Sequence, residues 1–236
     1  MTYLRQGARL RAAADFVRQD AVFADIGTDH AYLPLFLLEE GRIRRAVCAD
    51  IAEGPLAAAR AHAQDTPYAS RMSFHLGNGL DGLAEQGLTD IAICGMGGEL
   101  IADILSRAPF VRDGAVRLIL QPMTRQELLR RYLASHGFAI TEERYAVDAS
   151  RPYVTFCVHF SGECRTIGAE EAVLGASPER HLGEAAFALY VERHLAALTR
   201  AVRGKEQGGQ ACDEERAMLR ALQAMQQRLH CGRIEP

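Results

Sequence analysis

Residues 24–34 form a turn whose residue types could hold a nucleotide-like ligand. They read ADIGTDHAYLP, and the segment that leads into them is apolar. Gly27 lets the backbone come close to a ligand, and Thr28 and Asp29 are residue types that commonly cap helices. We therefore expect a helix to begin near His30, with the positive end of its dipole facing the turn.

The next two apolar runs also end in residues that suit an adenosine-type ligand. Asp50 ends the second run, where a carboxylate can accept hydrogen bonds from both hydroxyls of a ribose. Gly77, Asn78 and Gly79 end the third run, where a polar residue can meet the edge of an adenine. Each group on its own also fits an ordinary turn or helix cap. Their agreement at three successive strand ends favours one adenosine-type ligand.

The first turn distinguishes between two cofactors of this type. A dinucleotide pyrophosphate needs the close backbone amides of a G-x-G-x-x-G turn. The segment GTDHAYL, residues 27–33, offers one glycine and an aspartate, which would repel a phosphate. S-adenosylmethionine carries a sulfonium cation and no phosphate. The turn therefore favours a methyltransferase that uses this cofactor over a nicotinamide dehydrogenase.

The fourth apolar run ends in GMGGEL, residues 95–100. Methyltransferases acting on the exocyclic amino group of adenine commonly carry an Asn/Asp-Pro-Pro-aromatic motif here, whose side chain accepts from the amine. Glycines around Met96 offer no such acceptor. A ring nitrogen with its own lone pair, such as adenine N1, loses no proton before it attacks, so it suits this site better. Alternatively, the glycines only let the helix after Gly98 pack closely on the sheet.

Alternating strands and helices must position these turns. Short strands that are apolar almost throughout are typical of a parallel sheet covered on both faces, so we expect a doubly wound α/β fold. Predicted strands cover 21–27, 45–51, 72–77, 89–95 and 116–121. Predicted helices cover 3–19, 30–41, 53–64, 80–87, 98–107 and 124–136. Two further strands, 139–148 and 151–160, are expected to form an antiparallel hairpin at the sheet edge, as in the methyltransferase version of this Rossmann-like fold.

The chain becomes helical after Phe160. Apolar residues recur every three or four positions in 179–203 and again in 212–230. With the turn GKEQGGQA at 204–211, this pattern predicts an antiparallel, coiled-coil-like helical hairpin. We expect a methyltransferase domain over 1–161 and a helical domain over 162–236. The apolar stripe could cover its own chain, a second copy or a partner protein.

Composition excludes several classes of protein. The hydrophobic fraction of 48% and net charge of −3 are those of an ordinary globular protein, not of a strongly basic nucleic-acid binder. No apolar stretch approaches the roughly 20 residues of a membrane span, and the N-terminus lacks a signal-peptide core. We expect a cytoplasmic protein. The six cysteines are scattered, so we expect buried thiols, no disulfide and no metal.

Five segments together resemble the bacterial tRNA adenine-N1 methyltransferases of the TrmK family. They are ADIGTDHAYLP (24–34), DIAEGPLAAA (50–59), GNGL (77–80), ICGMGGELI (93–101) and LILQPM (118–123). The resemblance covers residues 9–160 and extends more weakly into the helical tail. It implies a class I methyltransferase fold with a coiled-coil-like C-terminal domain. It also implies S-adenosylmethionine as cofactor and methylation of N1 of adenine 22 in the D-arm of tRNA.

The resemblance also implies roles for individual residues. Those expected at the cofactor are Asp25, Gly27, Asp50, Asn78, Gly79, Gly95 and Met96. Those expected to face the target base are Asp29, His30, Tyr32 and Pro34, with Gln121 and Pro122 on the opposite wall. The family usually has aspartate where this chain has Asn78. An amide can still accept from the adenine amino group and donate to a ring nitrogen, so we expect a changed contact rather than a lost one.

The mechanism that follows is in-line attack of N1 of a flipped adenine on the sulfonium methyl, with the protein contributing mainly orientation. Asp29 is the candidate for stabilising the charge that develops on the base or for accepting from its amino group. Tyr32 is the candidate for stacking, and His30 for orienting Asp29 or touching the RNA. The candidate RNA-binding arginines are Arg5, Arg9, Arg11, Arg125, Arg130 and Arg131.

Three alternatives remain open. The chain could methylate a small molecule or a protein, or it could be a noncatalytic RNA-binding module that keeps this fold. His30 could be an ordinary local histidine. We expect a monomer or a weak homodimer with tRNA as its partner and no membrane association.

Overall fold

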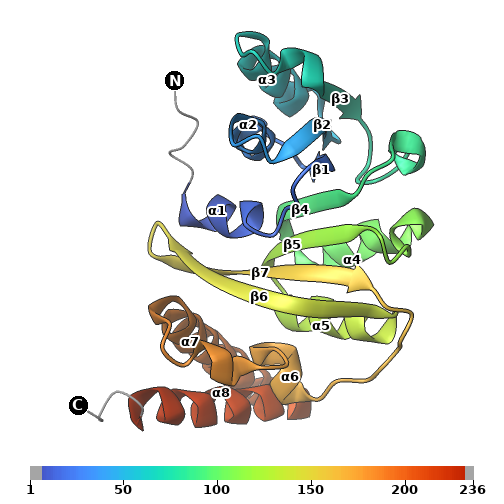
Figure 1. Ribbon diagram of the computed structural model, residues 1–236. Coiled ribbons are helices and arrows are strands. Elements are labelled where there is room, and N and C mark those ends of the chain that lie inside the picture. The colour runs from blue at the N-terminus through green and yellow to red at the C-terminus, as the bar shows by residue number, and fades with distance from the viewer. Residues whose placement is uncertain (1–6, 232–236) are drawn as a thin grey trace.

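A single mixed sheet of seven strands organises the computed structural model, which describes residues 7–231 of the 236. The strand order is β3-β2-β1-β4-β5-β7-β6, with the first five strands parallel and β7 antiparallel to both of its neighbours (Figure 1). The strands are β1 (Ala21–Ile26), β2 (Ile43–Asp50), β3 (Met72–Leu76), β4 (Asp90–Gly97), β5 (Arg117–Thr124), β6 (Phe138–Asp148) and β7 (Arg151–Phe160).

Helices cover both faces of the sheet, and each face has its own buried cluster. Side chains of α1, α2 and α3 pack on one face, whereas those of α4, α5 and the tail pack on the other. The helices before the tail are α1 (Ala8–Ala14), α2 (Tyr32–Glu39), α3 (Glu53–Gln64), α4 (Gly98–Ser106) and α5 (Gln126–Ser135). The predicted doubly wound fold with an antiparallel edge hairpin is confirmed.

Two predicted helices differ from the structure. Of the helix predicted over 3–19, residues 3–6 lie outside the described residues, and the remainder is helical only in α1. The helix predicted over 80–87 is wrong, because this segment contains only the short 3₁₀ turn Ala84–Gln86. Glycines with positive φ interrupt it, and helical backbone requires negative φ. They are Gly82 and Gly87, and Gly79, which directly precedes the segment, also has a positive φ.

The tail contains α6 (Ala169–Leu174), α7 (Ala185–Gln207) and α8 (Asp213–Cys231). The predicted helical pair is confirmed, although α7 extends into the segment predicted as a turn. The apolar stripe of α8 is buried, and it belongs to the same cluster as one face of the sheet. That stripe consists of Met218, Leu222, Met225 and Leu229. The chain therefore covers this stripe itself.

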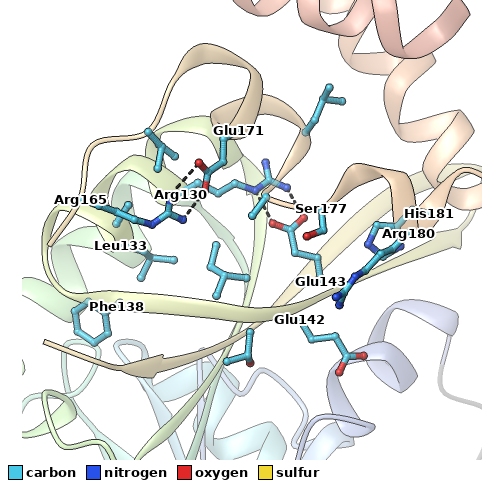
Figure 2. Close-up of a pocket in the computed structure, with 16 residues that line it drawn as sticks. Arg130, Leu133, Phe138, Glu142, Glu143, Arg165, Glu171, Ser177, Arg180 and His181 are labelled. Atoms are coloured by element: carbon cyan, nitrogen blue, oxygen red, sulfur yellow. Dashed lines mark hydrogen bonds and ion pairs between the residues drawn. The ribbon is translucent and has the colours of Figure 1, made fainter. Parts of the chain in front are cut away.

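Paired charges line the interface between the sheet and the helical tail. Figure 2 shows the pocket there, between α5, β6 and the segment around α6. Arg130 is 2% exposed and holds Glu143 through two bonds of 2.8 Å, while its Nη1 donates to the backbone oxygen of Ala172 at 2.9 Å. Arg165 pairs with Glu171 in the same view. Because these charged groups are paired with each other, we assign this pocket a structural role in holding the tail on the sheet.

Three further 3₁₀ turns complete the described elements. They are Ala69–Arg71, Pro109–Val111 and Pro178–His181. No helix within residues 7–231 has both the length and the apolar character that crossing a lipid bilayer requires.

Candidate active site

The carboxyl ends of β1, β2 and β3 are joined by backbone hydrogen bonds. The end of the sheet where these strands finish is called the edge below, and it is distinct from the outer hairpin β6–β7. The amides of Gly27 and Thr28 donate to the oxygen of Ala49 at 2.8 and 3.1 Å. The amide of Gly77 donates to the oxygen of Asp50 at 3.0 Å. Parallel pairing brings these ends together, and Gly27 adopts a φ of +76°, which favours glycine. The three turns singled out in the sequence thus form one continuous edge.

Asp25 lies buried beneath the first turn. Thr28 Oγ1 donates to its carboxylate at 2.8 Å, so this threonine holds Asp25 and does not cap a helix. Burial raises the pKa of Asp25 to about 6. The Thr28 bond and the positive charge of Arg9 lower this pKa, whereas the charges of Asp50 and Asp29 raise it. The Asp25 carboxylate is therefore fixed by the hydrogen bond from Thr28. It also lies close enough to Arg9, Asp29 and Asp50 for their charges to affect its pKa.

The helix after this turn begins later than predicted. It starts at Tyr32 rather than near His30, and its N-cap position is occupied by Ala31 in the left-handed conformation, with φ of 56° and no side-chain cap. Asp29 also has a positive φ, 48°. Such conformations are uncommon for residues with a Cβ and cost free energy, and they gather at functional sites.

Asp50 and Asn78 project at the ends of β2 and β3. Asp50 is half-buried, and its Oδ1 accepts a hydrogen bond from the amide of Ala52 at 2.9 Å. Asn78 is exposed, and its Oδ1 accepts from Arg107 Nη2 at 3.3 Å. The same arginine pairs with Asp81 at 2.9 Å. The arginine that directly follows α4 thus orients the amide that replaces the usual aspartate of the family.

Glycines after β3 and in the last part of β4 permit close approach. A Cβ on Gly79 would lie 2.9 Å from Ile104, and Met96 places its methyl 2.5 Å from where a Cβ on Gly27 would be. Gly95 is exposed, with a φ of +81°. For Gly98 the close-packing explanation is supported, since its Cβ would overlap a backbone oxygen at the start of α5. Met96 and Gly95 therefore shape the surface over the end of β1.

Asp29, His30 and Tyr32 gather with His62 in an exposed cluster. The Asp29 and His30 side chains are 73% and 47% exposed, and His30 Nε2 lies 3.6 Å from Asp29 Oδ1. The Tyr32 ring lies 5.4 Å from the His30 ring and 5.1 Å, edge-on, from that of His62. His62 Nδ1 also lies 2.8 Å from the backbone oxygen of His30. The structure therefore brings the three predicted catalytic residues together.

Pro34, predicted to face the target base, is buried, as are the two residues predicted for the opposite wall, Gln121 and Pro122. Pro34 packs inside the first turn of α2. Gln121 has no exposed surface: its Oε1 accepts from Arg9 Nη1 at 2.8 Å, and its Nε2 donates to Thr155 Oγ1 at 2.8 Å. Pro122 is buried beside it. Because these side chains lie within the packed interior, little of their surface is available to a base.

The candidate RNA-binding arginines have different surroundings. Arg9 is half-buried at the edge described above, whereas Arg125 is exposed beside Glu99 and Glu127, with 3.4 Å to each. Arg130, buried on Glu143, is unavailable, so that prediction is wrong. Arg131 Nη1 donates to a backbone oxygen before α6, and its Nη2 pairs with Glu214 of α8 at 2.8 Å. Arg11 is exposed, and Arg5 lies outside the described residues.

Sequence reasoning missed the contacts that three residues make at this edge, and it had assigned Thr28 to helix capping instead. They are Thr28, as the partner of Asp25, His62, as the partner of Tyr32, and Arg107, as the partner of Asn78. Thr28 stands three residues from its partner and could have been found from the turn. His62 comes from α3 and Arg107 from the residue after α4, so no local spacing indicates them.

The fold and this edge define a methyltransferase-type α/β protein. Residues 6–156 match the family of methyltransferase domains. A solved protein of Streptococcus pneumoniae, itself proposed to be a tRNA (m1A22) methyltransferase, is 30% identical, with a TM-score of 0.79 over 95% of this chain and 100% of that one. The chain belongs to the TrmK family of methyltransferases.

Further relatives agree with this placement. The tRNA (adenine(22)-N(1))-methyltransferase of Bacillus subtilis is 34% identical over 143 residues, which are 61% of this chain. The match spans 60% of that relative's length. The crystal structure of B. subtilis TrmK, an M1A22 tRNA methyltransferase, covers 96% of this chain with 26% identity and a TM-score of 0.77. The S. pneumoniae protein has also been solved in complex with S-adenosyl-L-methionine.

Proposed function

We propose that this chain methylates N1 of adenine 22 in the D-arm of tRNA, with S-adenosylmethionine as methyl donor. The observation that carries this proposal is the single edge formed by the turns after β1, β2 and β3, in a chain of the TrmK family. Relatives named for this activity support the choice of substrate.

The polar groups at the edge fit this cofactor. Asp50 uses one carboxylate oxygen on the amide of Ala52, which fixes the carboxylate and leaves its other oxygen for ribose hydroxyls. Asn78 would meet the adenine edge, with Gly79 behind it. Asp25, Gly27, Gly95 and Met96 would surround the sulfonium and the methionine part. Asp25 would act mainly through its charge and through the shape of the turn, because it is buried.

S-adenosylmethionine, when bound, supplies an electrophilic methyl group. The adenine N1 lone pair needs no base to free it, so the residues of the chain mainly orient the target. The Asp29 carboxylate would accept from the amino group of the base and stabilise the positive charge that develops on it. Tyr32, exposed and held edge-on by His62, offers a ring face for stacking. His30 would orient Asp29 through the contact seen here.

Methylation assays on unmodified tRNA test this proposal. Primer extension should stop at adenine 22 after incubation with enzyme and cofactor, because a methyl at N1 blocks base pairing. A tRNA carrying guanine at position 22 should not be modified. Methyl transfer to metabolites or proteins instead of tRNA would refute the substrate assignment. Lack of cofactor binding by calorimetry would refute the activity and favour a noncatalytic RNA-binding module.

Replacement of Asp29 tests the catalytic assignment. Asp29→Ala should lower kcat by about tenfold to a hundredfold, since one charged contact to the base is lost. Cofactor affinity should stay unchanged. Asp65→Ala is the matched control, because Asp65 is another exposed aspartate, located just after the C-terminal end of α3. A wild-type rate for Asp29→Ala would eliminate this residue as a catalytic group.

The proposal includes tRNA as the partner and a cytoplasmic location. Arg11 and Arg125 remain the exposed candidates for phosphate contacts among the described arginines predicted for this role. Such contacts predict that tRNA affinity falls steeply as salt rises. Size-exclusion chromatography with light scattering would test the expected monomer or weak homodimer.

A further inference from the structure

A histidine of α3 contacts residues 29–32, the segment proposed to face the target base and called the base-facing turn below. We propose that this histidine, His62, is a positioning residue for methyl transfer, because it fixes the backbone that carries Asp29 and Tyr32. The inference rests on the proposed function and adds to it a residue that acts through the turn. It is carried by one hydrogen bond, by the strained backbone beside that bond and by a ring contact.

The hydrogen bond joins the His62 side chain to the backbone of the turn. His62 Nδ1 lies 2.8 Å from the backbone oxygen of His30. A carbonyl oxygen only accepts hydrogen bonds, so Nδ1 must carry a proton and donate it. His62 is half-buried near the C-terminal end of α3, 32 residues away from His30 along the chain. The bond therefore ties the base-facing turn to a separate helix.

The backbone on both sides of this bond is strained. Asp29 and Ala31 have φ of 48° and 56°, in the left-handed region that residues with a Cβ adopt at a cost in free energy. The carbonyl that accepts from His62 belongs to the residue between them. A strained conformation persists only where its surroundings fix it. Without the His62 bond the turn can relax toward negative φ, which would move the Asp29 carboxylate and the Tyr32 ring.

The same histidine contacts the side chain proposed to stack on the base. The Tyr32 ring lies 5.1 Å from the His62 ring at an interplanar angle of 75°, which is an edge-to-face arrangement. It also lies 5.4 Å from the His30 ring. Tyr32 nevertheless remains 45% exposed. These contacts therefore orient the Tyr32 ring and still leave surface for a base.

Different partners hold the cofactor side of the same segment. The amides of Gly27 and Thr28 donate to the oxygen of Ala49, and Thr28 Oγ1 donates to Asp25. These bonds do not involve His62. Loss of the His62 bond should therefore disturb the base-facing turn and leave the cofactor side in place. The role of His62 is thus measurable as a change in methyl transfer without a change in cofactor affinity.

Two substitutions separate the N–H donor of His62 from its ring. His62→Asn keeps an N–H donor near the position of Nδ1 and removes the ring, whereas His62→Phe keeps a ring and removes the donor. His62→Phe should lower kcat for tRNA methylation by about threefold to tenfold, which corresponds to the net contribution of one hydrogen bond. His62→Asn should retain most of the wild-type kcat. His62→Ala, which adds no bulk, should lose at least as much kcat as His62→Phe.

Controls separate this role from folding and from ligand binding. His230→Asn, at an exposed histidine near the C-terminal end of α8, should leave kcat unchanged. Thermal unfolding checks each variant, and calorimetry with S-adenosylhomocysteine should give the wild-type affinity for each. KM for tRNA should also stay near the wild-type value, since phosphate contacts dominate affinity for nucleic acids. A loss confined to kcat therefore reports the orientation of the groups around the base.

Three results would overturn the assignment. One is a wild-type kcat for His62→Phe, or for His62→Ala if only that variant folds. Another is an equal loss of kcat in His62→Asn and His62→Phe, which would assign the effect to the ring. The third is a loss of cofactor affinity as large as the loss of kcat. If the wild-type protein does not methylate adenine 22, the proposed function itself fails, and the role of His62 fails with it.

Discussion

Replacing Asp25 with asparagine should remove a pH dependence of folding stability between about pH 4 and pH 6. Burial raises the pKa of this carboxyl from 3.8 to about 6. Below pH 4 the group is protonated in both the folded and the unfolded chain. Between pH 4 and 6 the unfolded chain releases the proton while the folded protein keeps it. Ionisation therefore stabilises the unfolded chain, and wild-type stability decreases as pH rises through this range.

The magnitude follows from the size of the shift. A rise of about two pKa units, at about 1.4 kcal/mol for each unit, costs the folded wild-type protein about 3 kcal/mol above pH 6. Asparagine does not ionise, so this cost is absent in Asp25→Asn. The amide oxygen can still accept from Thr28 Oγ1. Relative to wild type, the variant should gain up to about 3 kcal/mol between pH 4 and pH 6.

Urea denaturation of the cofactor-free proteins from pH 3.5 to pH 8 measures this difference. A constant offset between the two proteins would contain any cost of burying the amide, so only the change with pH reports the ionisation of Asp25. Burial lowers the pKa of His194 to about 4, and it titrates over an overlapping range with the opposite effect on stability. It is present in both proteins and cancels. Parallel stability curves across pH 4–6 would refute the reasoning.

Three further stability predictions follow from packing and charge. Arg130→Met leaves Glu143 buried without its partner and should lower the free energy of unfolding by about 3–5 kcal/mol. Adding Glu143→Leu should restore most of this free energy, and urea denaturation of both variants measures the difference. Gly98→Ala forces a Cβ against a backbone oxygen and should cost about 1–3 kcal/mol, while Gly54→Ala, which meets nothing within 4 Å, should not destabilise the protein in the same titration. Leu222→Ala should cost about 2–5 kcal/mol, and calorimetry should show one shifted unfolding transition because α8 shares its core with the sheet; separate transitions for sheet and tail would contradict this.

The fold could be predicted from the sequence because its signals are local. Apolar runs of strand length, separated by helical periodicity, predicted the five parallel strands, the edge hairpin and the two long tail helices. The helix over 80–87 failed because Gly82 and Gly87 adopt positive φ, which the apolar pattern does not reveal. The convergence of the turns at Gly27, Asp50 and Asn78 was also predictable, because parallel strands place their carboxyl ends at one edge.

The sequence by itself thus determined the elements, their order and the strand ends that carry the site. Only the tertiary structure decided the surroundings of each side chain. Arg9 and Arg130 looked alike as helix arginines, but one bonds to Gln121, 112 residues away, and the other is buried on Glu143. Burial of Pro34 and Gln121 likewise depends on elements distant in the chain. Periodicity reports which face of an element is apolar, whereas the partner of a charge depends on packing between elements, which no local pattern encodes.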